Sequence, residues 1–263
     1  MSITQPFAAS ASYQAIRERD EALAELERAR EGVTVCVTYH NEPDEVLWRA
    51  LDSAVTQTVR PFEVIIIDDG SERPPVGISR DSHGFPMRVV TITNRGLPAA
   101  RNTGLMLAKT VGFLPLDADD WLEPTYVEKT LPLLLDGADV VLTGLQEHGP
   151  TRNGTYFPGY NKPFDQVTVD DLWRTNLFYY CSLFRTETLR EIGGYNPLMA
   201  GPWNRRGGHE DHDVWLDLMT RGARFACCMD VLFNYSTANS QSMIHNVDYD
   251  ALMAEMKRHH RRP

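Results

Sequence analysis

Three aspartates close an apolar stretch near the middle of the chain: Asp117, Asp119 and Asp120 follow residues 112–116. An apolar run of this length predicts a short buried strand. In an open α/β sheet, ligands bind just outside the carboxyl ends of the strands. Carboxylates crowded there repel one another unless a cation or sugar hydroxyls compensate them. The stretch therefore predicts a site for a divalent metal and a ribose, or else an acidic turn before the helix expected from Pro124.

Two further acidic clusters occupy residues 68–69 and 210–213. Clusters at the ends of successive strands point to a single crevice. The chain contains neither Gly-x-Gly-x-x-Gly nor Gly-x-x-x-x-Gly-Lys, so we do not expect a glycine loop to hold phosphate groups. A metal at Asp119 would be the other way to hold a pyrophosphate. Both Mg²⁺ and Mn²⁺ suit carboxylate and phosphate oxygens.

These clusters need strands and helices to position them, and the two alternate between Gly32 and Gly144. Expected strands cover residues 33–38, 63–67, 88–92, 112–117 and 138–143, and expected helices cover residues 43–55, 97–109 and 124–135. Repeated βα units predict a doubly wound, mostly parallel sheet. Beyond Gly144 the chain is loop-rich, which indicates a lid and an acceptor-binding surface.

The two ends of the chain differ from this central part. We expect three parts: a polar segment and helix in residues 1–31, the main domain in residues 32–245, and a C-terminal helix and basic tail in residues 246–263. In the first part, Ile16, Leu23 and Leu26 form a thin apolar stripe. That helix could pack on the domain, pair with a partner or lie in solvent. The tail could contact an anionic surface or be a solvated end.

Composition excludes several classes of protein. The net charge of −10 argues against bulk binding of nucleic acid, which needs a basic face. No run of about 18 apolar residues predicts a membrane-spanning helix, and the N-terminus lacks the apolar core of a signal peptide. The four cysteines show no Cys-x-x-Cys pair, which is typical of buried thiols in a reducing compartment. We therefore expect a cytoplasmic protein, with peripheral contact at the inner face of the membrane as a further possibility.

Six motifs follow one another between about Val33 and Tyr235. They are Val-Thr-Tyr-His-Asn-Glu (37–42), Ile-Ile-Asp-Asp-Gly-Ser (66–71), Arg-Gly-Leu-Pro-Ala-Ala-Arg-Asn-Thr-Gly (95–104), Leu-Asp-Ala-Asp-Asp-Trp (116–121), Ile-Gly-Gly-Tyr (192–195) and Gly-His-Glu-Asp-His-Asp-Val-Trp-Leu (208–216). In this order they resemble the family-2 inverting glycosyltransferases, which have a GT-A fold. The resemblance implies that the chain transfers a sugar from a nucleotide sugar, UDP-linked, to an acceptor hydroxyl during polysaccharide or glycoconjugate synthesis. The implied acceptor is a saccharide or a lipid-linked molecule.

The resemblance also implies a nucleotide-binding set, which comprises Thr38, Tyr39, His40, Glu42, Asp69, Arg101 and Asp117. Thr38 through His40 would line the base pocket. Asp69 would accept the uracil N3–H, since a carboxylate is a pure acceptor. Asp68 would cap the following turn. Arg101 would face the ribose or the diphosphate, unless it lies on the surface of its helix.

Within the acidic turn, the resemblance implies that Asp117 binds the ribose and that Asp119 binds the metal, Mn²⁺ or Mg²⁺. Asp120 would be a helix cap or a group that supports the site. The family often completes its metal site with a histidine three places after a tyrosine of the last strand. Here that place holds Ala238, and His245 is the substitute candidate.

Asp211 is the implied catalytic base. In a helix from about Gly208 it would share a face with Trp215 and Leu218, and a carboxylate on an apolar face needs a reason to be there. Ionised, it could take a proton from an acceptor hydroxyl. The residues expected to bind or orient the acceptor are Trp203, Tyr195 and Glu210. Alternatively, residues 210 and 211 satisfy the first turn of the helix.

Two other functions remain open at this point. A non-catalytic protein of the same fold could bind sugar nucleotides without turning them over. An aspartyl-phosphate phosphatase also places Asp-x-Asp after a buried strand. In that class, however, the motif lies early in the chain and is followed by a small residue, whereas here Asp120 and Trp121 follow it.

Overall fold

The valine-rich segment Val33–Tyr39 forms strand β1, in which every residue is buried. The computed structural model describes residues 7–78, 84–150, 153–200, 209–237 and 249–260. In it, β1 pairs in parallel with β2 (Glu63–Asp68) on one side and β4 (Gly112–Asp117) on the other, and β3 (Met87–Thr91) extends the sheet beyond β2. This parallel half confirms the βα rhythm predicted from the sequence.

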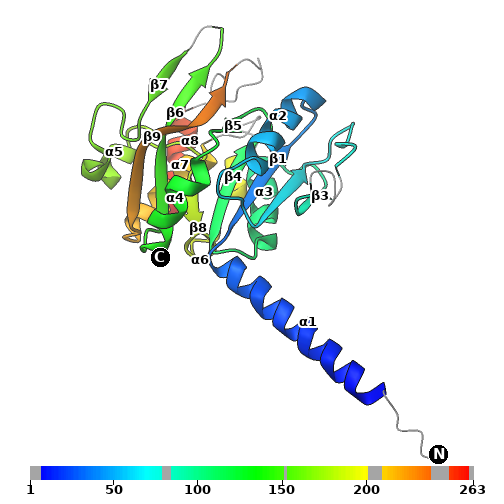
Figure 1. The fold of residues 1–263 in the computed structure, drawn as a ribbon. Coiled ribbons are helices and arrows are strands. Elements are labelled where there is room, and N and C mark those ends of the chain that lie inside the picture. The colour runs from blue at the N-terminus through cyan, green and yellow to red at the C-terminus, as the bar shows by residue number, and fades with distance from the viewer. Residues whose placement is uncertain (1–6, 79–83, 151–152, 201–208, 238–248, 261–263) are drawn as a thin grey trace, which may run out of the picture.

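The sheet continues past β4 with strands of mixed direction (Figure 1). The remaining strands are β5 (Trp121–Leu122), β6 (Val140–His148), β7 (Gly154–Tyr156), β8 (Leu183–Arg185) and β9 (Phe225–Ser236). Their order after β4 is β8-β6-β9-β5, with β7 paired to β6. Strand β8 is antiparallel to both β4 and β6, whereas β9 is parallel to β6. The chain thus has the α/β sheet of a GT-A fold.

The described part of the chain contains several α-helices, most of which cover the two faces of this sheet. They are α1 (Phe7–Arg30), α2 (Asp44–Val55), α3 (Leu97–Leu107), α4 (Tyr126–Leu135), α5 (Val169–Leu172), α6 (Thr186–Glu191), α7 (Glu210–Thr220) and α8 (Tyr249–His260), with 3-10 turns η1 (Phe164–Gln166) and η2 (Pro197–Ala200). Helix α4 begins at Tyr126 rather than at the predicted Pro124, because Trp121 and Leu122 first pair with β9 as β5.

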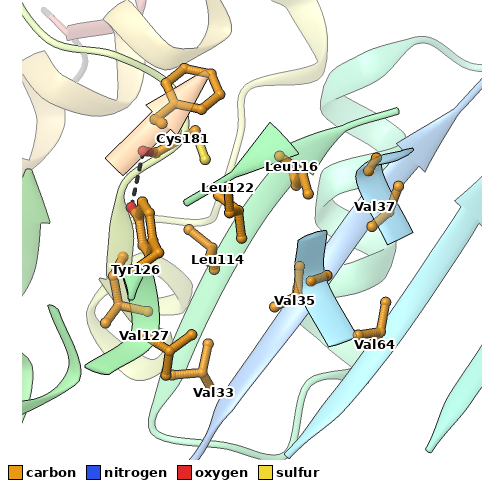
Figure 2. Packing of buried hydrophobic residues seen from close by; sticks show 14 of the residues in the cluster. Val33, Val35, Val37, Val64, Leu114, Leu116, Leu122, Tyr126, Val127 and Cys181 are labelled. Atoms are coloured by element: carbon orange, nitrogen blue, oxygen red, sulfur yellow. Dashed lines mark hydrogen bonds between the residues drawn. The ribbon is translucent and has the colours of Figure 1, made fainter. Parts of the chain in front are cut away.

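The alternation of side chains in β1 explains the two apolar layers. Val33, Val35 and Val37 face the layer that contains α2 and α4 (Figure 2). Cys36 faces the other layer, which contains α3, α7 and α8. Successive side chains of a strand point to opposite faces, so a buried strand must be apolar on both.

Helix α1 extends away from the sheet (Figure 1). Its Leu23 and Leu26 are about half exposed, and its last turn contributes the buried Ala29. The sequence left three arrangements open for this helix. Packing on the domain is seen at its last turn. Within the described part of the chain, no helix is long and apolar enough to cross a membrane.

Candidate active site

The carboxyl ends of β1, β2 and β4 meet at one edge of the sheet. Thr38 is in register with Asp117 on β4 and with Ile67 on β2, and Tyr39 is in register with Asp68. The two acidic clusters that follow β2 and β4 therefore flank the end of β1. This places both clusters at the edge where open α/β sheets bind ligands.

Asp117 is held from two directions. The Thr38 hydroxyl donates to its Oδ1 at 2.7 Å, and Arg101 Nη2 donates to Oδ1 and Oδ2 at 2.9 and 3.1 Å. The Asp117 side chain is 20% exposed, so its carboxylate reaches the surface of the crevice. A fixed, partly exposed carboxylate is suited to accept hydrogen bonds from ribose hydroxyls.

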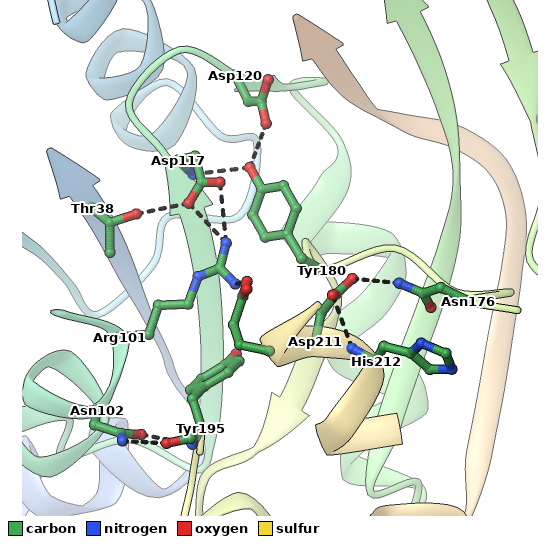
Figure 3. Close-up of polar contacts among 11 residues, drawn as sticks. Thr38, Arg101, Asn102, Asp117, Asp120, Asn176, Tyr180, Tyr195, Asp211 and His212 are labelled. Atoms are coloured by element: carbon green, nitrogen blue, oxygen red, sulfur yellow. Dashed lines mark hydrogen bonds and ion pairs between the residues drawn. The ribbon is translucent and has the colours of Figure 1, made fainter. Parts of the chain in front are cut away.

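Arg101 is buried rather than on the helix surface. Its helix, α3, packs so closely on β1 that a Cβ at Gly104 would come within 2.1 Å of the Cys36 sulfur. The side chain of Arg101 forms ion pairs with Asp117 and Glu210 (Figure 3). Burial alone would lower the pKa of Arg101, but these two carboxylates more than offset it and raise that pKa. The guanidinium therefore stays charged.

Glu210 begins α7 and points toward Arg101. Its predecessor His209 has a left-handed backbone with φ of 63°, which turns the chain into the helix. Burial raises the pKa of the Glu210 carboxyl to about 7, while Arg101 acts in the opposite direction. Glu210 is only 3% exposed, and Tyr195 is fully buried. The sequence analysis expected Glu210 and Tyr195 to contact the acceptor. Their burial does not support that contact and favours supporting roles beneath the site.

Asp211, the next residue, is partly exposed at the first turn of α7. Its Oδ2 accepts a hydrogen bond from Asn176 Nδ2 at 2.9 Å, and its Oδ1 accepts the backbone N–H of His212 at 2.9 Å (Figure 3). The predicted apolar face is present further along the helix, where Trp215 stacks on Phe184. Asp211 thus stands at the border between the core and solvent, with free acceptor capacity on each oxygen.

Asp120 faces the core behind the acidic turn. It is fully buried and accepts hydrogen bonds from the Tyr180 hydroxyl and, at 2.7 Å, from the backbone N–H of Ser236. Burial, together with the charges of Asp119 and Asp117, raises the pKa of Asp120 well above its ordinary value. In this position Asp120 ties the acidic turn to Tyr180 and to Ser236.

Asp119 lies on the outer side of the same turn and is partly exposed. Its backbone carbonyl accepts a hydrogen bond from Arg49 at 2.6 Å, and the Arg49 guanidinium lies 3.9 Å from the ring centre of Trp121. Among the described residues, no group of three or more His, Cys, Asp or Glu side chains could hold a metal ion. The donor set here is the oxygen type that Mg²⁺ and Mn²⁺ prefer.

The residues expected to line the base pocket form hydrogen bonds with neighbouring residues of the same region. Tyr39 is buried, and its hydroxyl lies within hydrogen-bonding distance of the backbone carbonyls of Glu42 and Arg73, which share its single proton. His40 is exposed, with Nδ1 2.9 Å from the carbonyl oxygen of Asp69. The Glu42 carboxylate accepts the His40 backbone N–H at 2.6 Å. On this segment the side chain of His40 is thus exposed, whereas those of Thr38 and Tyr39 are buried.

The two aspartates after β2 have different partners. Asp68 accepts hydrogen bonds from the backbone of Ser71 and the hydroxyl of Thr91, as expected for a turn cap. Asp69 accepts the backbone N–H groups of Arg95 and Gly96 at 2.9 and 2.8 Å. The Asp69 carboxylate thus holds the loop that leads into α3.

Sequence reasoning missed Asn176 and Tyr180. Asn176 orients Asp211, and Tyr180 contacts Asp117, Asp120 and Arg101. Both lie in the loop-rich second half, where no local pattern distinguishes them from structural polar and aromatic residues. Trp203 and His245 lie outside the described residues.

The known proteins most relevant to this geometry are glycosyltransferases. The family model described as Glycosyl transferase family 2 matches residues 34–193, which is more than half of the chain. The chain is 32% identical over 154 residues to the glycosyltransferase GlyA of Streptococcus pneumoniae, an alignment that covers 54% of this chain and 22% of GlyA. It is 27% identical over 177 residues to the chondroitin synthase of Escherichia coli, covering 66% of this chain and 24% of the synthase. The chain spans less than a quarter of either relative.

A third relative is matched over most of its length. The amylovoran biosynthesis glycosyltransferase AmsE of Erwinia amylovora is 27% identical over 202 residues, covering 74% of this chain and 71% of AmsE. Among solved structures, the chain is similar to residues 1–349 of S. aureus TarS in complex with UDP-GlcNAc. The TM-score is 0.67 at 19% identity, covering 86% of this chain and 66% of that one. At this identity the likeness shows a shared fold.

Proposed function

The chain belongs to glycosyltransferase family 2, and on this premise we propose that it moves a sugar from a UDP-linked donor to an acceptor hydroxyl with inversion at the anomeric carbon. The observation that carries the proposal is a pair of ion pairs: Asp117, and Glu210 at the start of α7, both bind the guanidinium of Arg101. This convergence brings a candidate ribose ligand and a candidate base into one site.

In the proposed reaction, Asp211 takes the proton of the acceptor hydroxyl. The acceptor oxygen forms a bond to the anomeric carbon, and the bond from that carbon to the diphosphate oxygen breaks with its electron pair going to UDP. Asn176 orients the Asp211 carboxylate through its hydrogen bond at 2.9 Å. Attack opposite the leaving nucleotide gives a β-linkage from an α-linked donor.

On the donor side, we assign the ribose to Asp117 and the base to the segment from Thr38 to His40. Asp69 stays the candidate acceptor for uracil N3–H, because each of its oxygens accepts one backbone N–H and retains acceptor capacity. The solved complex of TarS with UDP-GlcNAc supports a UDP-linked donor by fold analogy.

The oxygen donors of the acidic turn fit a divalent cation, with Asp119 as the proposed protein ligand. Mn²⁺ or Mg²⁺ bound there would stabilise the negative charge of the departing diphosphate. His245 remains a proposed additional ligand.

The acceptor is proposed from the relatives. The names of chondroitin synthase and of the amylovoran enzyme refer to polysaccharide synthesis, which favours a saccharide or lipid-linked acceptor. Trp203 is the proposed acceptor-contacting side chain. A cytoplasmic site of action at the inner face of the membrane belongs to the same proposal.

Release of UDP from a panel of UDP-sugars tests the proposal. The full chain is incubated with each donor and Mn²⁺, with and without saccharide acceptors, and Asp211→Asn serves as the matched control. We expect UDP release from at least one donor that the control lacks. Binding of UDP without release from any donor would indicate the non-catalytic alternative. Release of inorganic phosphate from phosphomonoesters would indicate the phosphatase.

A further inference from the structure

Tyr180 lies at the point where the acidic turn, α3 and β9 meet, and no local sequence pattern distinguishes it. We propose that Tyr180 is a positioning residue, which fixes the turn of residues 117–120 so that Asp117 can engage the nucleotide and Asp119 the cation. The inference rests on the proposed function, since it assigns a task to Tyr180 within that site.

The hydroxyl of Tyr180 bridges the two ends of the turn. It accepts the backbone N–H of Asp117 at 2.9 Å and donates its own proton to the Asp120 carboxylate (Figure 3). The turn also closes on itself, because the Asp120 backbone N–H donates to the Asp117 carbonyl at 3.1 Å. Asp119 sits between these two fixed points. Its position therefore depends on Tyr180, although no contact between the two side chains is needed.

The same turn is tied to β9 through Asp120. The second oxygen of Asp120 accepts the backbone N–H of Ser236 at 2.7 Å. The ring of Tyr180 also packs edge-on against Phe233 of β9, with ring centres 5.3 Å apart. The ring of Tyr180 thus contacts β9 directly and its hydroxyl is linked to β9 through Asp120, which limits the freedom of the hydroxyl to move.

The face of the Tyr180 ring contacts the guanidinium of Arg101, which is the partner of the Asp117 carboxylate. The guanidinium carbon of Arg101 lies 4.4 Å from the ring centre, a distance at which a cation is attracted to an aromatic face. That guanidinium holds both oxygens of Asp117. Tyr180 therefore acts on Asp117 twice, through its backbone N–H and through Arg101.

Tyr126 provides a matched control for a purely structural hydroxyl. It is fully buried, belongs to the same apolar layer as Tyr180, and its hydroxyl donates to the Cys181 carbonyl at 3.1 Å. This bond involves neither Asp117 nor Asp120. Tyr126→Phe and Tyr180→Phe each remove one hydroxyl from the core, and only Tyr180→Phe removes the bridge.

The test measures UDP binding by calorimetry, with Mn²⁺ and after chelation, together with thermal unfolding. For Tyr180→Phe we expect UDP affinity in Mn²⁺ to fall about five- to tenfold, the factor for losing one well-placed hydrogen bond. Tyr126→Phe should lose thermal stability but bind UDP as the wild type does. Equal UDP affinity in the two variants would overturn the proposal.

A second variant keeps the test decisive if Tyr180→Phe does not fold. Asp120→Asn preserves the size of the side chain and weakens the bridge from its other end, so we expect the same loss of UDP affinity. Where both fold, the double variant should bind UDP no more weakly than the weaker single one, because the two changes remove one interaction. Wild-type affinity in folded Asp120→Asn, or fully additive losses, would contradict the proposal. Failure of the wild type to bind UDP would instead count against the proposed function.

Discussion

Arg101 and Glu210 form a buried ion pair across 109 residues of sequence, and both side chains are almost fully withdrawn from solvent. The pair joins α3, which carries the guanidinium that holds Asp117, to α7, whose next residue is Asp211. The proposed donor-side and acceptor-side groups are thereby fixed relative to one another. A buried pair of this kind costs desolvation energy, so its presence between two functional segments favours a role in specifying geometry.

Glu210→Gln is expected to change how stability depends on pH. Burial raises the pKa of Glu210 from 4.5 to about 7, so the native state binds more protons than the unfolded state between these values. The contribution of Glu210 to the free energy of unfolding should therefore decrease as pH rises from about 4.5 to about 7. Urea unfolding of wild type and variant across this range measures the difference, with the exposed Glu187→Gln as control. A difference that does not vary with pH would contradict the assignment.

His260 should contribute stability with the same sign of pH dependence as Glu210, but over a higher pH range. Burial alone would lower its pKa, but hydrogen bonds to Asp213 and Asp217 raise it from 6.5 to about 9. This contribution is complete below pH 6.5 and is lost as pH rises through about 9. We expect His260→Gln to reduce the stability of the wild type at pH 6 and to make little difference at pH 10. Lys257→Gln, an exposed change on the same helix, should show no such trend.

The parallel half of the sheet could be predicted because its information is local. Periodic apolar runs define β1, β2 and β4, and parallel strands bring their carboxyl ends to one edge. Asp68, Asp117 and Asp120 could accordingly be placed at that edge, and the structure confirms this placement. The pattern of apolar residues alone was enough to place a candidate functional side chain wherever that side chain directly follows a strand.

The remainder depends on tertiary contacts that no local pattern encodes. Tyr180 reaches the acidic turn just ahead of β8, a strand of three residues that inserts between β4 and β6. The partnership of Arg101 and Glu210 follows from how α3 and α7 pack. His260 packs against Trp173 and pairs with α7, whereas Lys257 and Arg258 are exposed, so the solvated tail or encounter surface expected for the basic end stays a prediction.

Asp69→Asn should weaken both folding and nucleotide binding. Each oxygen of Asp69 accepts one backbone N–H of the loop before α3, and an amide can replace only one of these acceptors. The unsatisfied N–H should cost about 1–3 kcal/mol in the free energy of unfolding. Urea unfolding and UDP calorimetry measure the two effects, with the exposed Asp52→Asn as control. A variant of wild-type stability would show that these hydrogen bonds are not what Asp69 supplies.

Asp119→Ala should remove most of the gain in UDP affinity that Mn²⁺ confers, since its carboxylate is the proposed protein ligand of the cation. Calorimetry with UDP, with Mn²⁺ and after chelation, gives this gain as a ratio of dissociation constants. Asp165→Ala, an exposed aspartate far along the chain, should leave the ratio unchanged. Wild-type affinity that is the same after chelation would rule out the metal role altogether.

The central claim is that Asp211 is the base, and turnover of Asp211→Asn tests it most directly. Asparagine keeps the shape and the contact with Asn176 but cannot take the acceptor proton. We expect sugar transfer to fall by about 10²–10⁴-fold while UDP affinity stays close to that of the wild type. Asp217→Asn, two turns further along α7, should retain turnover. Near-normal transfer by Asp211→Asn would contradict the account and assign the base to another residue.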